Sequence, residues 1–128
     1  MKLLLDTHTL LWWWTDDPQL PDSARALIAD EGNEVLVSAA SAWEIATKHR
    51  LGKLPEAGDA IPRFNELVAA DGFLHLPVNY LHSLRAGAYA IDHCDPFDQV
   101  LAAQSELESA SLVTRDPAFT AFGTRVVW

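Results

Sequence analysis

The sequence predicts an α/β protein whose mostly parallel sheet, of four to five strands, is covered by helices on both faces. Short apolar runs such as Lys2–Leu5 and Glu34–Ser38 have the composition of buried strands. Each run is followed by a segment whose apolar residues repeat at helical spacing. Strands that alternate with helices pair in parallel, because the intervening helix carries the chain back across the sheet. The 128 residues are expected to form one domain over 1–128.

The first half of the chain predicts two strand–helix units and two further helices. The first strand stops at a polar turn that begins with Asp6, and Asp22 is in position to cap the next helix. Gly52 ends the helix that follows the second strand. Helices are expected over Thr9–Trp14, Ser23–Glu31, Ser38–Leu51 and about 61–71.

The second half predicts three more strands and two more helices. A proline follows an aspartate at both Asp95 and Asp116, a pattern that begins helices. Strands are expected over Phe73–Val78, Ser111–Thr114 and Thr124–Trp128. Helices are expected over Leu81–Ile91 and from Asp95-Pro96 to about Ser109, with a short helical turn after Asp116-Pro117.

Composition excludes several classes of protein. A single cysteine, Cys94, rules out an internal disulfide framework and a cysteine-ligated zinc site. No segment has the length of a membrane span, and Asp6 interrupts the first apolar run too early for a signal peptide, so we expect a cytoplasmic protein. The net charge of −9 opposes attraction of nucleic acid by bulk charge. Divalent cations or a basic partner chain would offset it.

Carboxylates follow the predicted strands or begin the next helices. In parallel sheets, the functional crevice lies beyond the carboxyl ends of the strands. The acids expected at this edge are Asp6, Glu44, Asp95, Asp98 and Asp116. Carboxylates that share one mouth repel one another, and hard divalent cations with oxygen ligands relieve that repulsion. The set therefore predicts a Mg²⁺ or Mn²⁺ site, which suits hydrolysis of a phosphodiester by metal-activated water.

Each of these acids also fits a purely structural role as a helix cap. Ser41 to Glu44 has the form of a capping box, and Asp95 and Asp116 each precede a proline. Asp6 ends an apolar strand, and apolar residues surround Asp98 in the sequence. Because a buried carboxylate is costly without a cation, these last two fit a capping role less well.

Four motifs together resemble the PIN-domain nucleases, and specifically the toxins of VapBC toxin–antitoxin systems. These motifs are Leu-Leu-Leu-Asp-Thr-His at 3–8, Ser-Ala-Trp-Glu-Ile-Ala-Thr-Lys-His-Arg-Leu-Gly-Lys-Leu at 41–54, His-Cys-Asp-Pro-Phe-Asp-Gln-Val-Leu-Ala-Ala-Gln at 93–104 and Leu-Val-Thr-Arg-Asp at 112–116. The four motifs occur in the family's order and at compatible spacing, and the resemblance extends over essentially the whole chain. One departure is Gln99, where this subgroup commonly has arginine.

The resemblance implies a three-layer α/β/α PIN-like domain that acts as a Mg²⁺-dependent endoribonuclease toxin. It also implies a cognate antitoxin that inhibits the toxin, and a toxin homodimer. By the resemblance, the catalytic, metal-binding acids are Asp6, Glu44, Asp98 and Asp116, with Asp95 as a possible additional acid.

Two further groups of residues are candidates for binding. Lys48, Arg50 and Lys53 form, with His49, a basic cluster that either contacts RNA phosphates or only favours the helix dipole. Trp12, Trp13 and Trp14 are consecutive, so a helix cannot turn all of them into one core. We expect at least one of them to lie near the surface. Such an indole either forms part of a partner interface or is only partly buried under the next helix.

Two other functions remain open from the sequence. The same fold with an incomplete site would be a module that binds RNA or protein without cleaving. A phosphohydrolase with Asp6 as its nucleophile is the other alternative, although His8 stands where such enzymes usually have a second acid. Neither His8 nor His93 is assigned a catalytic role.

Overall fold

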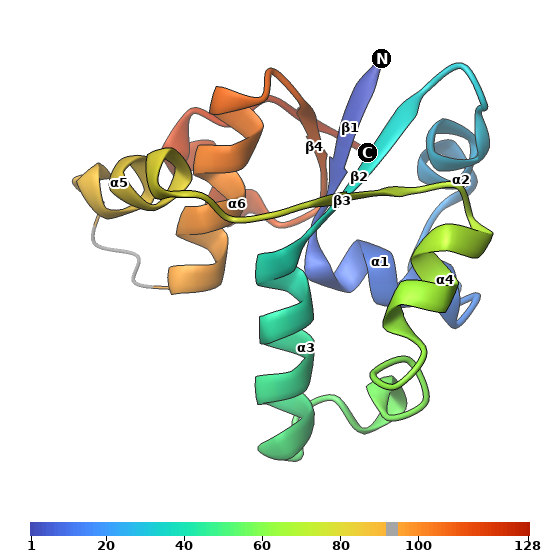
Figure 1. Cartoon of the computed structure of the whole chain (residues 1–128). Coiled ribbons are helices and arrows are strands. Elements are labelled where there is room, and N and C mark those ends of the chain that lie inside the picture. The colour runs from blue at the N-terminus through green and yellow to red at the C-terminus, as the bar shows by residue number, and fades with distance from the viewer. Residues whose placement is uncertain (92–94) are drawn as a thin grey trace.

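A five-stranded sheet, parallel throughout, forms the centre of the computed structural model, which describes residues 1–91 and 95–128. Its strands are β1 (Lys2–Leu5), β2 (Glu34–Ser38), β3 (Leu74–Leu76), β4 (Ser111–Val113) and β5 (Val126–Val127). Their order across the sheet is β3-β2-β1-β4-β5, so β1 lies in the middle (Figure 1). The chain adds β2 and β3 on one side of β1 and then crosses to add β4 and β5 on the other.

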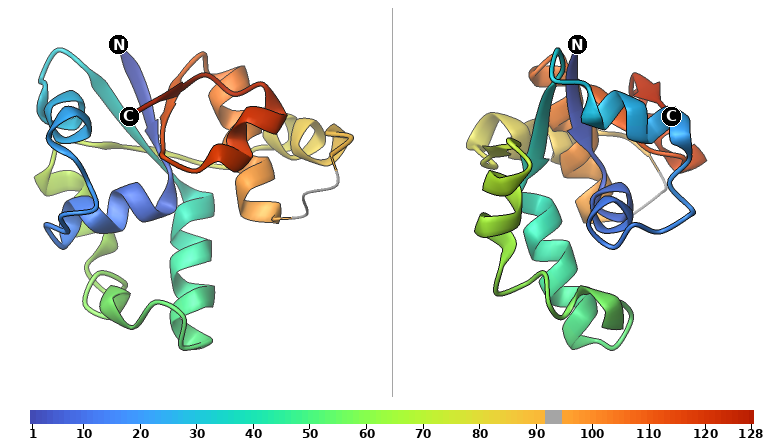
Figure 2. Two further views of the ribbon diagram at one scale, coloured as in Figure 1. Left: turned by 180° about the vertical axis from the view of Figure 1, so that it is seen from behind. Right: turned by 90° about the vertical axis from the view of Figure 1, so that its right-hand side faces the viewer.

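Helices cover both faces of this sheet. They are α1 (Thr7–Trp14), α2 (Asp22–Ala29), α3 (Ala39–Arg50), α4 (Phe64–Ala70), α5 (Tyr80–Ala88) and α6 (Pro96–Leu107), with 3₁₀ turns η1 (Pro55–Ala57) and η2 (Pro117–Phe122). Figures 1 and 2 show α1, α2 and α4 to one side of the strands and α5 and α6 to the other. Helix α3 extends from the end of β2 away from the sheet (Figure 1).

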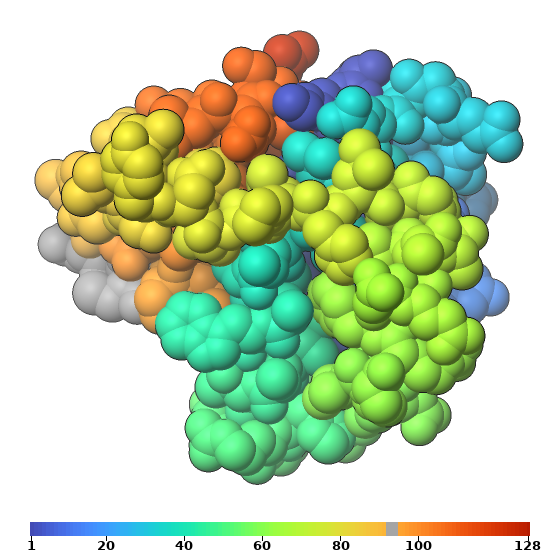
Figure 3. Space-filling view, in the orientation of Figure 1, coloured from blue at the N-terminus to red at the C-terminus, as the bar shows by residue number. Residues whose placement is uncertain are grey.

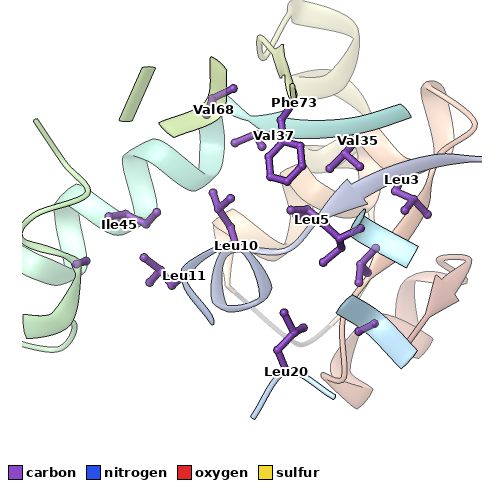
Figure 4. Packing of buried hydrophobic residues seen from close by; sticks show 14 of the residues in the cluster. Leu3, Leu5, Leu10, Leu11, Leu20, Val35, Val37, Ile45, Val68 and Phe73 are labelled. Carbon is purple, nitrogen blue, oxygen red and sulfur yellow. The ribbon is translucent and has the colours of Figure 1, made fainter. Parts of the chain in front are cut away.

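Alternation along β1 divides the buried apolar residues into two clusters. Leu3 and Leu5 point to the face covered by α1, α2 and α4, where they pack with Leu10, Val37 and others (Figure 4). Leu4 points to the opposite face and packs in the cluster formed mainly by α6, β4 and η2. Both faces of the central strand are thus buried, as is usual for a parallel sheet.

The structure confirms the predicted α/β class and all five predicted strands, and the sheet is fully rather than mostly parallel. The two outer strands are shorter than predicted. The last residue pair of β3 with β2 joins Leu76 to Ser38, where β2 ends and α3 begins. Strand β3 therefore ends where its neighbour β2 ends. Strand β5 pairs only with β4, over Val126 and Val127.

Several helix ends differ from the predictions. Helix α1 begins at Thr7, two residues early, because Asp6 caps it. Asp22 was expected to cap α2, but it lies within the first turn, and Pro21 holds the capping position without a side-chain hydrogen bond. Helix α2 stops at Ala29, because the next residue, Asp30, takes extended backbone. The predictions for Cys94 and His93 fall outside the described residues.

The three consecutive tryptophans are all partly buried against the cluster around β1. The indole N–H groups of Trp13 and Trp14 donate to Asp71 at 3.1 and 3.0 Å. These two hydrogen bonds link α1 to the end of α4, where Asp71 is the capping residue. Within the described part of the chain, no helix is both long and apolar enough to cross a membrane.

We expect Leu4→Ala to destabilise the protein strongly, since Leu4 is fully buried in the central strand. A cavity at such a position costs about 2–5 kcal/mol in the free energy of unfolding, as measured by urea denaturation. The matched control is Leu107→Ala at the end of α6, where the residue is 46% exposed. That change should alter the free energy by less than about 0.5 kcal/mol. Equal effects would contradict the described core.

Candidate active site

The carboxyl ends of β1, β2 and β4 meet at one edge of the sheet and bring the five predicted acids together. Strand β1 lies between β2 and β4, so the edge beyond it is where ligands bind in open α/β sheets. A cavity of about 60 Å³ opens there. It is lined by Asp6, Thr7, His8, Glu44, Lys48, Asp95, Asp98, Leu101 and Asp116.

Asp6 follows β1 directly and is held on both carboxylate oxygens. Its Oδ1 accepts the backbone N–H of Thr9 at 2.7 Å, which makes it the cap of α1, and the Thr114 hydroxyl donates to its Oδ2. Asp6 thus caps a helix, contrary to the expectation that capping fits it poorly. Burial raises the pKa of Asp6, while the hydrogen bonds from Thr114 and Thr9 oppose that effect.

Glu44 lies in the second turn of α3, which is further along the helix than a capping residue would be. The capping box predicted from Ser41 to Glu44 is wrong, because α3 begins three residues earlier and Ser38 caps it by accepting the N–H of Ala40 at 3.0 Å. The Glu44 side chain is therefore free of the helix terminus and reaches the cavity, where only 4% of it is exposed. The Thr7 hydroxyl donates to Glu44 Oε1 at 2.5 Å.

Lys48 lies one turn after Glu44 on α3, and its ammonium group forms an ion pair with Glu44 Oε2. Burial alone would lower the pKa of Lys48. The hydrogen bond to Glu44 and the negative charges of Glu44, Asp95 and Asp98 outweigh burial and raise this pKa. Lys48 therefore keeps its positive charge within the acidic cavity.

The remaining acids come from the segments that begin α6 and η2. Asp95 caps α6 by accepting the N–H groups of Phe97 and Asp98 at 2.9 and 3.3 Å. Asp98 lies in the first turn of that helix and is partly exposed. Asp116 caps η2 by accepting the N–H of Ala118 at 2.9 Å. The capping roles predicted for Asp95 and Asp116 are confirmed, and both side chains also line the cavity.

Hydroxyl side chains that the sequence analysis did not single out hold the acids in place. Thr114 joins two of them, because its hydroxyl donates to Asp6 while its Oγ1 accepts the N–H of Asp116 at 3.0 Å. Thr7 Oγ1 contacts Glu44 and also lies 3.0 Å from Ser41 Oγ. The available signal was position: Thr7 follows Asp6 after β1, and Thr114 directly follows β4.

The donor chemistry of the cavity fits a hard divalent cation, since carboxylate oxygens are the ligands that Mg²⁺ and Mn²⁺ prefer. In the arrangement of residues 1–91 and 95–128, however, no three acids or histidines are grouped closely enough to hold one ion jointly. In this arrangement threonine hydroxyls, a backbone N–H and Lys48 engage the carboxylate oxygens of Asp6 and Glu44. Joint binding of one ion would therefore require the acids to move closer together.

A larger hollow of about 350 Å³ adjoins the acidic cavity and shares Asp6, His8 and Asp116 with it. Trp12, Arg115 and Pro117 complete its lining. The Arg115 guanidinium lies 4.4 Å from the centre of the Trp12 ring, in cation–π contact. An aromatic ring and a cation thus stand beside the carboxylates.

The candidate binding residues are divided between the cavity and the surface. Lys48 lines the cavity, whereas Arg50 and Lys53 are exposed at and just beyond the end of α3. Trp43, which the sequence analysis passed over, is 58% exposed and packs edge-on against Phe97 at 4.6 Å.

Comparison with known proteins gives the family. The family model of the PIN domain matches residues 3–124. The chain belongs to the PIN domain family. One curated relative of this PIN domain is Ribonuclease VapC16 of Mycobacterium tuberculosis, which is 39% identical over 62 residues. That match spans 48% of this chain and 44% of the relative.

Solved structures share the fold of this PIN domain. The structure of FitAcB from Neisseria gonorrhoeae aligns with a TM-score of 0.67 and 22% identity, over 98% of this chain and 96% of that one. The structure of VapBC2 from Rickettsia felis bound to a DNA fragment from its promoter aligns with a TM-score of 0.62 and 14% identity. This alignment covers 100% of this chain and 98% of the other.

Asp6→Asn should stabilise the protein at neutral pH in the absence of divalent ions. Because the pKa of Asp6 is raised above its ordinary value of 3.8, the folded protein binds this proton more tightly than the unfolded chain does. Its contribution to stability is therefore complete at low pH and is lost as the pH rises through the raised pKa. Asparagine carries no charge and still caps α1.

The measurement is the melting temperature in EDTA between about pH 4 and pH 7, where the titration of Asp6 changes stability. We expect the variant to exceed wild type most at pH 7, and the difference to shrink towards pH 4. Asp59→Asn, at an exposed loop position, is the control and should show no such trend. A variant that melts below wild type at pH 7 would refute the assigned cost of burying Asp6.

Proposed function

We propose that this PIN domain is a metal-dependent endoribonuclease, the toxin of a VapBC-type pair, which hydrolyses RNA phosphodiester bonds. The observation that carries the proposal is the convergence of five carboxylates, from segments far apart in the sequence, on one small cavity. In a protein that bound no cation here, the repulsion among these carboxylates would only lower stability. The name of the relative Ribonuclease VapC16 supports the same activity.

Asp6, Glu44, Asp98 and Asp116 would hold Mg²⁺, or Mn²⁺, and Asp95 would add negative charge beside them. The bound ion supplies Lewis acidity, activation of water and stabilisation of the charge that develops on the phosphate. The chain itself sets the orientation of the ligands: Thr114 fixes Asp6 and Thr7 fixes Glu44. Helix α6 presents Asp98 from its first turn.

RNA would lie across the hollow beside the acids. Its volume of about 350 Å³ is of the order of a nucleotide, and Arg115 offers a cation for a phosphate close to Asp6 and Asp116. Trp12 offers an aromatic surface on the wall of the same hollow. Arg50 and Lys53 would contact phosphates further along the strand. These cations give the acidic protein local positive charge where the substrate passes.

The partners that we infer are an antitoxin, which would inhibit the nuclease, and a second copy of the chain. The net charge of −9 favours a basic partner protein, and VapBC2 is a similar structure by fold. Figure 3 shows the segment from α4 through β3 to α5 at the surface. Within β3 and α5, the apolar residues Leu74, Tyr80, Leu81 and Leu84 are exposed. These apolar side chains suit a homodimer contact.

The three consecutive tryptophans would serve a partner through the parts of their rings left uncovered. Cleavage of cellular RNA by such a toxin would take place in the cytoplasm.

The purified chain should cut total cellular RNA in Mg²⁺ and stop when EDTA is added. Asp98→Asn should lower the rate about 100-fold or more, since metal ligation supplies several kcal/mol of transition-state stabilisation. Asp59→Asn is the control and should keep the wild-type rate. Mapping of the cut ends identifies the substrate.

Cleavage that persists in EDTA, or in Asp98→Asn, would refute metal-dependent hydrolysis. A chain that binds RNA without cutting it under any of these conditions would instead be a binding module. Trapping of a phosphorylated Asp6 would point to the phosphohydrolase.

A further inference from the structure

Lys48 occupies a position among the acids that differs from the positions of the other basic residues on its helix. Its ammonium group is paired with Glu44 inside the cavity, and three quarters of its side chain is covered. The ammonium also lies 5.9 Å from the centre of the Phe97 ring, over its face. Arg50 and Lys53, by contrast, are exposed. Lys48 is thus built into the site rather than offered to an incoming strand.

Glu44 has both carboxylate oxygens engaged by protein groups. Thr7 donates to Oε1, and Lys48 is paired with Oε2. Each carboxylate oxygen has more than one lone pair, so a divalent cation that takes Glu44 as a direct ligand binds beside one of these partners or replaces it. The Thr7 hydroxyl is neutral and can stay in place beside a bound metal ion. The positively charged ammonium group of Lys48, by contrast, repels the metal ion.

The geometry of α3 makes exchange of Lys48 feasible. Residues four apart on a helix face the same side, which is why Lys48 meets Glu44 without help from other elements. The lysine side chain is long and flexible, and a quarter of it already contacts solvent. Its ammonium can therefore leave Glu44 for water while the helix stays in place.

We propose that Lys48 is an internal counterion that competes with Mg²⁺ for Glu44, so that metal binding must displace its ammonium group from the acids. This inference rests on the proposed function, because it takes the cavity as the metal site. Lys48 then stabilises the cluster of carboxylates in the absence of metal and lowers its affinity for Mg²⁺.

Calorimetric titration of the full chain with Mg²⁺, without RNA, tests this inference directly. Lys48→Gln should lower the Kd for Mg²⁺ about tenfold, which is the affinity equivalent of one charged hydrogen bond. Lys53→Gln removes the same formal charge from an exposed position after the same helix. Its Kd should stay within about twofold of wild type, because salt screens exposed charges.

Lys48→Arg keeps the positive charge and provides the second comparison. Its Kd for Mg²⁺ should stay within about threefold of wild type, since the competing cation is still present. A Kd that falls as far as in Lys48→Gln would show that charge competition is not the cause. A Lys48→Gln variant that binds Mg²⁺ no better than wild type, or more weakly, would make Lys48 a support for Glu44 and overturn the inference.

Melting temperatures give a readout independent of affinity and activity. In EDTA, Lys48→Gln should melt below wild type, because buried Glu44 loses its cationic partner. Addition of Mg²⁺ should raise the melting temperature of the variant more than that of wild type. If the variant is unfolded in EDTA, Mg²⁺ should restore its fold, and failure to do so would count against the inference.

Failure of this inference is distinguishable from failure of the proposed function. A wild type that binds Mg²⁺ and cuts RNA, together with a Lys48→Gln variant of unchanged affinity, leaves the nuclease standing and removes the competition. A variant that binds Mg²⁺ when wild type does not supports the competition. If neither protein binds Mg²⁺, both proposals are wrong.

Discussion

Parallel pairing of β1 with β2 on one side and β4 on the other forces the chain to leave all three strands at the same edge of the sheet. The segments that follow are the ones that bear Asp6, Glu44 and Asp116, and α6 adds Asp95 and Asp98 from the adjoining layer. Convergence of the acids is therefore a consequence of topology. It carries an electrostatic cost, because like charges at close range disfavour one another and burial disfavours each charge.

The structure offsets this cost in two ways. Asp6, Asp95 and Asp116 each accept backbone N–H groups at the start of a helix or 3₁₀ turn, where partial positive charge favours a carboxylate. Glu44 lies beyond the first turn of α3 and has no helix terminus to help it. Instead, Glu44 is paired with Lys48. Capping and a role in the site, which the sequence presents as alternatives, are compatible here, because the contacts that cap the start of a helix also orient the carboxylates that line the cavity.

Much of this arrangement can be predicted from the sequence, and the exceptions have physical reasons. Lys2–Leu5 and Glu34–Ser38 are apolar and sharply bounded, so their strand limits were predicted correctly. Strand order was not predictable, because nothing local fixes which neighbours β1 takes. The start of α3 was ambiguous, since Ser38 and Ser41 both suit a cap, and only the length of β2 decides between them. The pairing of Glu44 with Lys48 follows from their spacing, but its burial depends on Thr7, which is distant in sequence.

The location of a bound divalent ion is the most direct test of whether this edge of the sheet is a metal site. Crystals soaked in Mn²⁺ and measured for anomalous scattering would show where the ion binds. We expect a peak within the cavity bounded by Asp6, Glu44, Asp98 and Asp116, with Lys48 turned away from Glu44. An ion bound only elsewhere on the surface, or no ion at millimolar Mn²⁺ with the cavity fully ordered, would contradict a metal site built by convergence of these acids.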